Sequence, residues 1–526
     1  MIRKLAPLLV LLCAPACKNP SPPGGKRVSI IASAEIAGVV EPCGCTSDIL
    51  GDVSRIRSLA KDGIWVDAGN LLYDADTYKG ERQFQAEVKA RCLAGIVQPA
   101  EVALGAKDVV GPMPDGLKLH AVNVAAPFVK PPTVRVLNGV RIGVIGAVAP
   151  GPLPGGLVAT DPRPALARAV QQLAAAKPDV IVALLAMRRP EARQLLATVP
   201  GIDFGVFSVD TDEGLRDPEP VTNGSRTAFL VGPANEGRRV ARLDVVLQGG
   251  SLALFADDKQ RQAQAERLKP RIAKQSARVA ELRSTAGTDP EFLRTSEEEL
   301  RKLENEARRL AEASRPPTTS YFTYELVPVR RSVPRDADGG ALIKQADQTI
   351  GASNLERAAK VEPPAPEPGK PSFVGQATCK DCHPSQAAFW ETTQHARAWQ
   401  TVVGVGKQYD YDCIGCHVSG WQKPGGSHLA SVEKKQLTSV QCEVCHGPGS
   451  DHLKADEAHR KSTIVKTPDE NLCGSTCHIK EHSDTFERAA YLRDVTGKGH
   501  GEVFRKSLGD GPTAHELRAA AKARVP

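Results

Sequence analysis

Residues 413–417 read Cys413-Ile414-Gly415-Cys416-His417, and the same C-x-x-C-H spacing recurs at 379–383 and 442–446. A fourth copy at 473–478, Cys473-Gly474-Ser475-Thr476-Cys477-His478, has one extra residue between its cysteines. In a C-x-x-C-H motif both thiols bond covalently to a haem, and the histidine becomes the proximal ligand of its iron. Zinc sites and disulfide frameworks require no histidine after every second cysteine. The sequence therefore predicts four c-type haems.

The predicted attachment residues are thiols and imidazoles. The thioether cysteines are Cys379, Cys382, Cys413, Cys416, Cys442, Cys445, Cys473 and Cys477. The proximal iron ligands are His383, His417, His446 and His478. The fourth site is the less regular one, because its peptide must bulge between the two thiols.

The surrounding stretch, residues 373–503, resembles the tetrahaem cytochrome c-554/c-prime family. Phe373-Val374-Gly375, Trp390–Ala398 and Cys442–His452 carry the resemblance. It implies a mostly helical, loop-rich fold in which packed haems form much of the core. It also implies that the irons take second, distal ligands from histidines that match the family; the candidates are His395, His452 and His500, then His482 and His428. The family often leaves one haem without a distal ligand, and His428 could close such a site.

The first 17 residues are predicted to be a lipoprotein-type signal peptide. Arg3 and Lys4 are basic, Leu5–Leu12 is a short apolar run, and Cys17 is the expected lipidated residue. The alternative is an ordinary secretory signal that is cleaved nearby. Both predict export, to the periplasm or the outer surface of a bacterial membrane, and residues 18–25 would form a flexible tether.

Charge gives no support to nucleic-acid binding. The formal net charge is +7, and removal of Arg3 and Lys4 with the signal peptide leaves about +5. Eight haem propionates and four ferric charges would then bring the mature protein to about +1 when oxidised, and about −3 when reduced. We therefore expect redox proteins outside the cytoplasm as partners, and the membrane through a lipid anchor.

Residues 26–257 are predicted to form a layered α/β domain, because strand-length apolar runs alternate with helical patterns. Short segments resemble motifs of the 5′-nucleotidase branch of the calcineurin-like metallophosphatases. These segments are Glu35–Cys43, Asp67–Asn70, Leu104–Asp108 and Asp179–Leu185.

Several positions depart from the family's metal ligands. The positions that correspond to the family's metal-binding motifs hold Glu35, Ala37, Asp67, Asn70, Lys107 and Asp108. Alanine and lysine cannot replace the nitrogen and oxygen ligands that a two-metal hydrolase needs. We interpret the domain as non-catalytic. The alternative is a rearranged metal site built from Glu35, Asp67, Asp108 and Asp210.

The remaining organisation follows from composition. Residues 258–314 predict a charged helical hairpin or coiled coil, 315–360 a strand and a helix that complete the α/β part, and 361–372 a Pro-rich linker. A tail, 504–526, follows the haem domain. Three cysteines outside the haem motifs and the signal peptide, Cys43, Cys45 and Cys92, favour a structural role such as a disulfide over a soft-metal site, and their pairing stays open.

Three functions remain in order of preference. The first is an extracytoplasmic multihaem cytochrome that transfers electrons. The second is an oxidoreductase that acts on a small nitrogen or sulfur compound at a five-coordinate haem, with Arg397, Lys423 or Tyr409 as nearby donors. The third is a metal-dependent phosphoesterase fused to a cytochrome.

Overall fold

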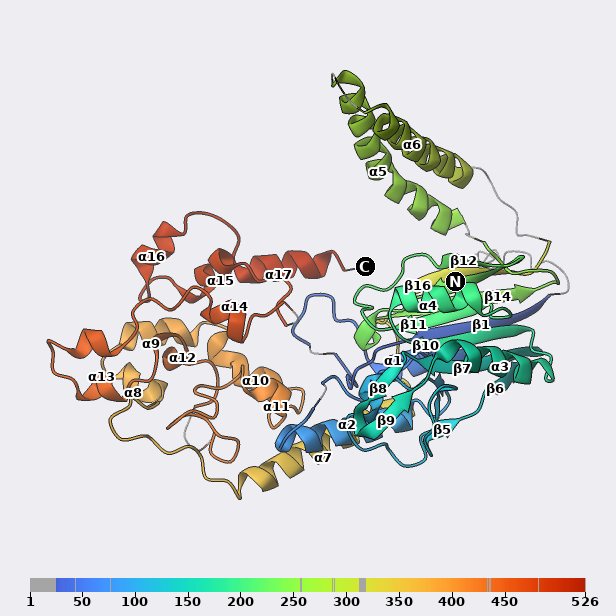
Figure 1. The fold of residues 1–526 in the computed structure, drawn as a ribbon. Helices are drawn as coiled ribbons and strands as arrows, with labels where there is room; N and C mark the ends of the chain where they lie inside the picture. Colours follow the sequence, from blue (N-terminus) through green and yellow to red (C-terminus); the bar gives the residue numbers. More distant parts are fainter. Residues whose placement is uncertain are drawn as a thin grey trace, which may run out of the picture.

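The computed structural model divides the protein into two lobes and a projecting helical hairpin (Figure 1). It describes residues 25–525, except 43, 76, 256–257, 286, 288, 312–317, 433, 435–436 and 481. The predicted signal peptide, with Cys17, lies outside the described residues. We call residues 26–359 without the hairpin the α/β lobe, and residues 373–525 the C-terminal lobe.

Two mixed sheets form the centre of the α/β lobe. One has six strands in the order β15-β16-β14-β1-β2-β3, and the other has six in the order β12-β13-β11-β10-β7-β6. The first sheet's strands are β1 (Lys26–Ser33), β2 (Ile64–Asp67), β3 (Glu101–Val102), β14 (Arg239–Leu247), β15 (Ala253–Leu254) and β16 (Tyr321–Pro328). The second sheet's are β6 (Thr133–Leu137), β7 (Val140–Val148), β10 (Val180–Ala186), β11 (Phe204–Ser208), β12 (Glu219–Asn223) and β13 (Arg226–Val231). Two small ribbons pair β4 (Leu119–His120) with β5 (Val129–Lys130) and β8 (Gly151–Leu153) with β9 (Leu157–Ala159).

The two sheets pack face to face around one aromatic cluster. Phe322 of β16 meets Phe204 and Phe229 of the other sheet edge-on, with ring centroids 4.9 and 4.7 Å apart. Central strands such as β10 (Val180–Ala186) consist of continuous apolar runs, because both faces of these strands are covered. The sandwich predicted from the sequence is confirmed.

Helices cover the outer face of each sheet. On the first sheet lie α1 (Val53–Leu59), α2 (Glu81–Ile96) and α7 (Ala337–Ala358); on the second lie α3 (Pro162–Ala174) and α4 (Arg189–Thr198). As predicted, Asp161 caps α3: its carboxylate accepts a hydrogen bond from the Arg163 N–H, and Pro162 begins the helix.

The hairpin consists of α5 (Asp258–Ser284) and α6 (Pro290–Ala311) and projects away from both lobes (Figure 1). Leu268, Val279 and Leu303 are buried between its helices. At its base Gln264 donates to Asp217 of the α/β lobe.

The C-terminal lobe contains only short helices, as the resemblance implies. They are α8 (Gln376–Lys380), α9 (Pro384–Glu391), α10 (Ala398–Val403), α11 (Tyr411–Ile414), α12 (Cys442–His446), α13 (Ser450–Lys454), α14 (Leu472–Thr476), α15 (Arg488–Val495), α16 (Glu502–Ser507) and α17 (Ala514–Ala523). One small apolar core joins Trp399, Val402, Ile414 and Val418. The predicted tail is not separate from this lobe, because Arg493 of α15 donates to the Leu508 and Pro512 carbonyls.

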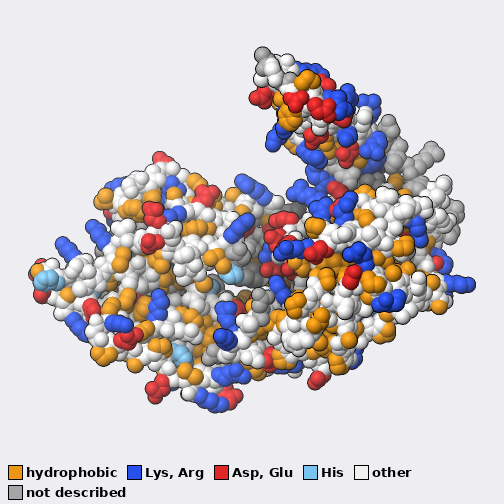
Figure 2. Space-filling view, in the orientation of Figure 1, with side chains coloured by type: hydrophobic (Ala, Val, Ile, Leu, Met, Phe, Trp, Pro, Cys, Tyr) orange, Lys and Arg blue, Asp and Glu red, His pale blue; other side chains and the backbone are white. Residues whose placement is uncertain are grey.

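Helix α7 contributes side chains to the cores of both lobes. Its first part places Ile343, Ala346 and Ile350 in the core under the first sheet, whereas Leu355 and Ala358 pack in the core of the C-terminal lobe. The two lobes are therefore joined before the Pro-rich linker begins. Figure 2 shows the face hollowed between them, with the hairpin rising from the α/β side. Within the described residues, no helix is long and apolar enough to cross a membrane.

Candidate haem centres and the α/β lobe's polar site

Each C-x-x-C-H motif lies at a short helical turn. The first begins in α8, the second in α11, the third fills α12 and the fourth follows the start of α14. Residues three apart in a helical turn lie on one face. A single turn therefore brings both thiols of a motif to the same side, followed at once by the histidine.

Six of the predicted iron ligands face one another in three pairs. His383 lies opposite His452, with ring centroids 6.3 Å apart. His395 lies opposite His478 at 6.2 Å, and His446 opposite His500 at 6.1 Å. An iron held between two imidazoles, with metal–nitrogen distances of about 2.0 Å, would separate ring centroids by roughly 6 Å. Each pair joins one proximal histidine and one histidine that the resemblance offers as a distal ligand.

Hydrogen bonds orient three of these imidazoles, and that of His417, for metal binding. The Nδ1 atoms of His417, His446, His452 and His500 lie 2.6, 2.6, 2.8 and 2.8 Å from backbone carbonyl oxygens. A carbonyl oxygen only accepts, so each Nδ1 carries the proton and each Nε2 keeps its lone pair. Burial, together with the neighbouring His395 and Arg518, lowers the pKa of His478 to about 4, so that this imidazole is neutral too. The donor set fits haem iron.

His417 differs from the other proximal histidines. Its Nδ1 lies 2.6 Å from the Ala398 carbonyl oxygen and 3.2 Å from the Thr401 hydroxyl. Within the part of the chain that the structure describes, no second imidazole ring lies opposite it. His428 is buried, 7% exposed, and the neighbouring Leu429 and Val432 belong to the apolar core of the C-terminal lobe.

The thiols of different motifs meet. The Cys442 thiol of the third motif lies close enough to Cys379 of the first to raise its pKa, and the Cys416 thiol of the second motif raises the pKa of Cys477 of the fourth. Cys416 Sγ also lies 3.6 Å from the Thr476 carbonyl oxygen. Cys445 and Cys473 are close enough for the charge of one to raise the pKa of the other. The four motifs thus lie in an order that differs from their order in the chain.

The other residues predicted to lie near a haem iron are not part of the facing histidine pairs. His482 is not one of the facing pairs. Tyr409 packs into the apolar core beside α7, where its carbonyl accepts a hydrogen bond from Asn354. Arg397 and Lys423 form none of the ion pairs of the described residues, and their role as donors beside an open haem stays a prediction.

In the α/β lobe the degenerate phosphatase positions form a hydrogen-bonded polar site. Asp108 is fully buried and accepts hydrogen bonds from the N–H groups of Asn70, Leu71, Leu72 and Gly105. These bonds anchor the loop after β2 and occupy both carboxylate oxygens. Burial nevertheless raises the pKa of Asp108 to about 6.

Two further positions of this site, Lys107 and Glu35, carry opposite charges that neutralise each other. The Lys107 ammonium lies 4.0 Å from the Glu35 carboxylate, and Glu35 accepts a hydrogen bond from the Thr211 hydroxyl. Ala37 is buried and contributes no donor atom. Among the described residues no three His, Cys, Asp or Glu side chains are grouped to hold a metal ion. The residues present do not fit a two-metal hydrolase, and Glu35, Asp67, Asp108 and Asp210 do not assemble the rearranged site.

Of the remaining cysteines, Cys92 is buried in α2, which raises its pKa to about 12. The Cys45 carbonyl accepts a hydrogen bond from Arg518 of α17. Cys43 lies outside the described residues, so the pairing stays a prediction.

Sequence reasoning missed the residues that support the haem ligands. The carbonyls of Ala398, Arg460, Val465 and Val495 orient four imidazoles, and backbone carbonyls leave no mark in a sequence. It also missed Lys407, Asp410 and Asp412, which bind the α/β lobe. Their one visible signal is a cluster of charges directly before Cys413.

Comparisons with known proteins found similarity in the C-terminal lobe. Residues 378–447 match the family model of cytochrome c554 and c-prime. Cytochrome c-554 of Nitrosomonas europaea is 38% identical over 130 residues, which cover 21% of this chain and 54% of that protein. The chain therefore spans about half the length of the curated relative it matches. The C-terminal lobe is thus similar in sequence to a c-type cytochrome.

Solved structures of a cytochrome c554 and of a 5′-nucleotidase precursor are each similar to part of the chain. The reduced state of cytochrome c554 from Nitrosomonas europaea is 26% identical and covers 28% of this chain and 86% of its own, with a TM-score of 0.19. The 5′-nucleotidase precursor from Thermus thermophilus is 17% identical, covering 66% of this chain and 61% of its own, with a TM-score of 0.40.

Proposed function

We propose that the protein is an extracytoplasmic multihaem cytochrome that transfers electrons through four covalently bound haems. The observation that carries this proposal is the set of three facing histidine pairs, each joined to a C-x-x-C-H motif. A haem iron with two histidine ligands has no free position for a substrate, so it passes electrons and does no chemistry on a bound molecule.

The geometry supports one assignment of axial ligands. His452 would serve the first haem with His383, His500 the third with His446, and His395 the fourth with His478. The protein's part is to hold each imidazole by its Nδ1–H, to exclude water and to set the local charge; bound haem supplies the reversible one-electron chemistry.

The thiol contacts support an order for the electron path. The first motif lies beside the third, the third lies near the fourth, and the fourth contacts the second. Electrons would therefore pass along the haems in the order one, three, four, two. The first and second haems would be the two ends, where redox partners exchange electrons.

A second candidate function rests on His417. Because no imidazole faces it among the described residues, its haem would keep an open axial position. A small nitrogen or sulfur compound, or a gas, could bind there, and the protein would then be an oxidoreductase. The predicted export and lipid anchor at Cys17 suit either function, since c-type haem is attached outside the cytoplasm.

A haem count with optical spectra tests both functions. We expect a pyridine haemochrome assay to give four haems per chain, and the Cys473→Ala/Cys477→Ala variant to give three. Carbon monoxide should bind one haem of the reduced protein. A count of three in the unaltered protein would overturn the fourth site. No spectral change with carbon monoxide would overturn the open haem and leave the electron carrier.

A further inference from the structure

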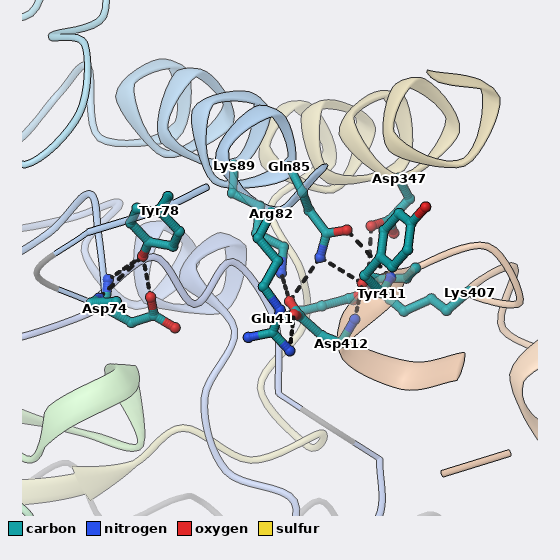
Figure 3. Close-up of polar contacts among 12 residues, drawn as sticks. Glu41, Asp74, Tyr78, Arg82, Gln85, Lys89, Asp347, Lys407, Tyr411 and Asp412 are labelled. Atoms are coloured by element: carbon teal, nitrogen blue, oxygen red, sulfur yellow. Dashed lines mark hydrogen bonds and ion pairs between the residues drawn. The ribbon is translucent and has the colours of Figure 1, made fainter. Parts of the chain in front are cut away.

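The α/β lobe forms hydrogen bonds and ion pairs with one short peptide of the C-terminal lobe. This peptide, residues 407–412, leads directly into the second haem motif. Almost every described polar contact between the two lobes involves this peptide. The exceptions are Ser47 with Asp484, and Arg518 with the Cys45 carbonyl. We call the contacts of 407–412 with Glu41, Gln85, Lys89, Asp347 and Asn354 the lobe clamp. Figure 3 shows most of them between α2, α7 and the start of α11.

Helix α2 supplies one half of the clamp. Gln85, 2% exposed, donates to Asp410 at 2.6 Å and to Asp412 at 2.8 Å. Lys89 forms an ion pair with Asp412 at 2.6 Å. Asp410 in turn caps α11, because its carboxylate accepts the Asp412 N–H at 2.9 Å. The α/β lobe therefore holds the cap of the helical turn that contains Cys413.

Lys407 supplies the other half. Its ammonium lies 2.9 Å from Glu41, in the loop after β1, and 2.8 Å from Asp347 of α7. Its side chain is 16% exposed. Burial alone would lower the pKa of Lys407, but the two carboxylates outweigh burial and raise it, so the lysine stays charged. One cation thus joins two separate segments of the α/β lobe to the peptide.

Apolar packing also connects the α/β lobe to the second haem motif. Leu355 and Ala358 of α7 pack in one core with Trp399, Val402 and Ile414. Trp399 and Val402 belong to α10, whose Ala398 carbonyl holds His417 Nδ1 at 2.6 Å. The polar clamp therefore fixes Cys413, and the apolar core fixes the group that orients His417.

We propose that Gln85, Lys89 and Lys407 are positioning residues for the second haem; this proposal rests on the proposed open haem. By holding 407–412, the α/β lobe keeps the second motif in the arrangement in which no histidine faces His417. Leu429 and Val432 pack in the same core, so a loosened second motif would let a side chain of that segment reach the iron. The lobe would then act as a fixed frame for one haem, without a catalytic site of its own.

The test compares clamp variants with matched controls in the full-length holoprotein. Gln85→Leu removes the hydrogen bonds of an uncharged side chain, and Lys407→Met removes the bridging cation. Lys130→Met is the matched control, because Lys130 pairs with buried Glu101 at 2.6 Å, away from the C-terminal lobe. Asp484→Asn is the second control, since it weakens the lobe contact at Ser47.

The readouts are the high-spin haem signal in electron paramagnetic resonance and the carbon monoxide bound per chain. We expect Gln85→Leu and Lys407→Met each to lose at least half of the high-spin signal and of the carbon monoxide binding. Lys407→Arg should retain most of both, and the two controls should match the unaltered protein.

Two outcomes would overturn the proposal in different ways. Unchanged signals in Gln85→Leu, whose haem count stays at four, would overturn the positioning role while the open haem stands. An unaltered protein without a high-spin haem would overturn the open haem itself. Gln85→Leu leaves Lys89 and Lys407, and with them the ion pairs of the lobe clamp, in place, so it decides the question even if Lys407→Met fails to fold.

Discussion

Asp67 ends β2 with its carboxylate fully buried in the α/β lobe. It accepts hydrogen bonds from the Ser33 hydroxyl at 2.6 Å and the Gly69 N–H at 2.9 Å. Ser33 in turn accepts the Trp65 indole N–H at 2.8 Å. Burial outweighs these donors and raises the pKa of Asp67 to about 7, so the folded lobe binds this proton more tightly than the unfolded chain.

A pH dependence of stability follows from Asp67. The stabilisation is complete below the ordinary pKa of an aspartate and is lost as pH rises through 7. Between pH 4 and pH 8 we expect a loss on the order of 3 kcal/mol, from 1.36 kcal/mol per pKa unit. Urea unfolding followed by Trp65 fluorescence measures it.

The Asp67→Asn variant should remove most of this slope, and the weaker shift of Asp108 should leave a remainder. Asp115→Asn is the control, because Asp115 is exposed. A slope that persists unchanged in Asp67→Asn would contradict the assignment.

At the residue scale, the sequence predicted those ligands that are marked by a motif. The proximal histidines follow a cysteine in each motif, so their identity needed no structure. His395, His452 and His500 came from the resemblance, but their partners could not be predicted, because pairing depends on how distant turns meet. His452 illustrates this: it lies six residues after His446 in the chain but opposite His383 in space.

At the element scale, periodicity identified the hairpin but not what it contacts. Apolar residues at heptad-like intervals predicted α5 and α6, and Leu268, Val279 and Leu303 are indeed buried between them. Helix α7 shows the limit of such reasoning. Its apolar residues belong to two different cores, and a helical period is the same whichever lobe each residue contacts.

The hairpin should be a separate unit of stability. Leu303 is 7% exposed, and its replacement by alanine should cost about 2–3 kcal/mol of local stability. Phe292, 45% exposed, should cost less than about 1 kcal/mol when replaced by alanine. Hydrogen exchange of α5 and α6 measures both changes.

Because the hairpin touches the α/β lobe at its base, the haem spectrum should not change in the Leu303→Ala variant. A changed spectrum, or faster exchange that spreads through β16 and β14, would show that the hairpin is coupled to the lobes.

At the scale of the whole molecule, sequence and structure differ in what separates the lobes. Composition marks residues 361–372 as a linker, and a linker of this kind predicts lobes that move freely. The structure shows instead that α7 and the lobe clamp join them before the linker starts. Lys407 and Glu41 are 366 positions apart in the chain, so no local pattern could have revealed their pairing.

Cutting the linker should therefore leave the lobes together. With a protease site placed in the exposed stretch 365–370, we expect the two fragments to elute as one complex in size-exclusion chromatography. The complex should persist in 1 M salt, because buried ion pairs are screened much less than exposed ones. Gln85→Leu combined with Lys407→Met should separate the fragments, since Asp347 would lose its cation and Glu41 would keep only Arg335, within its own lobe. Fragments of the unaltered protein that separate at low salt would contradict the joined arrangement.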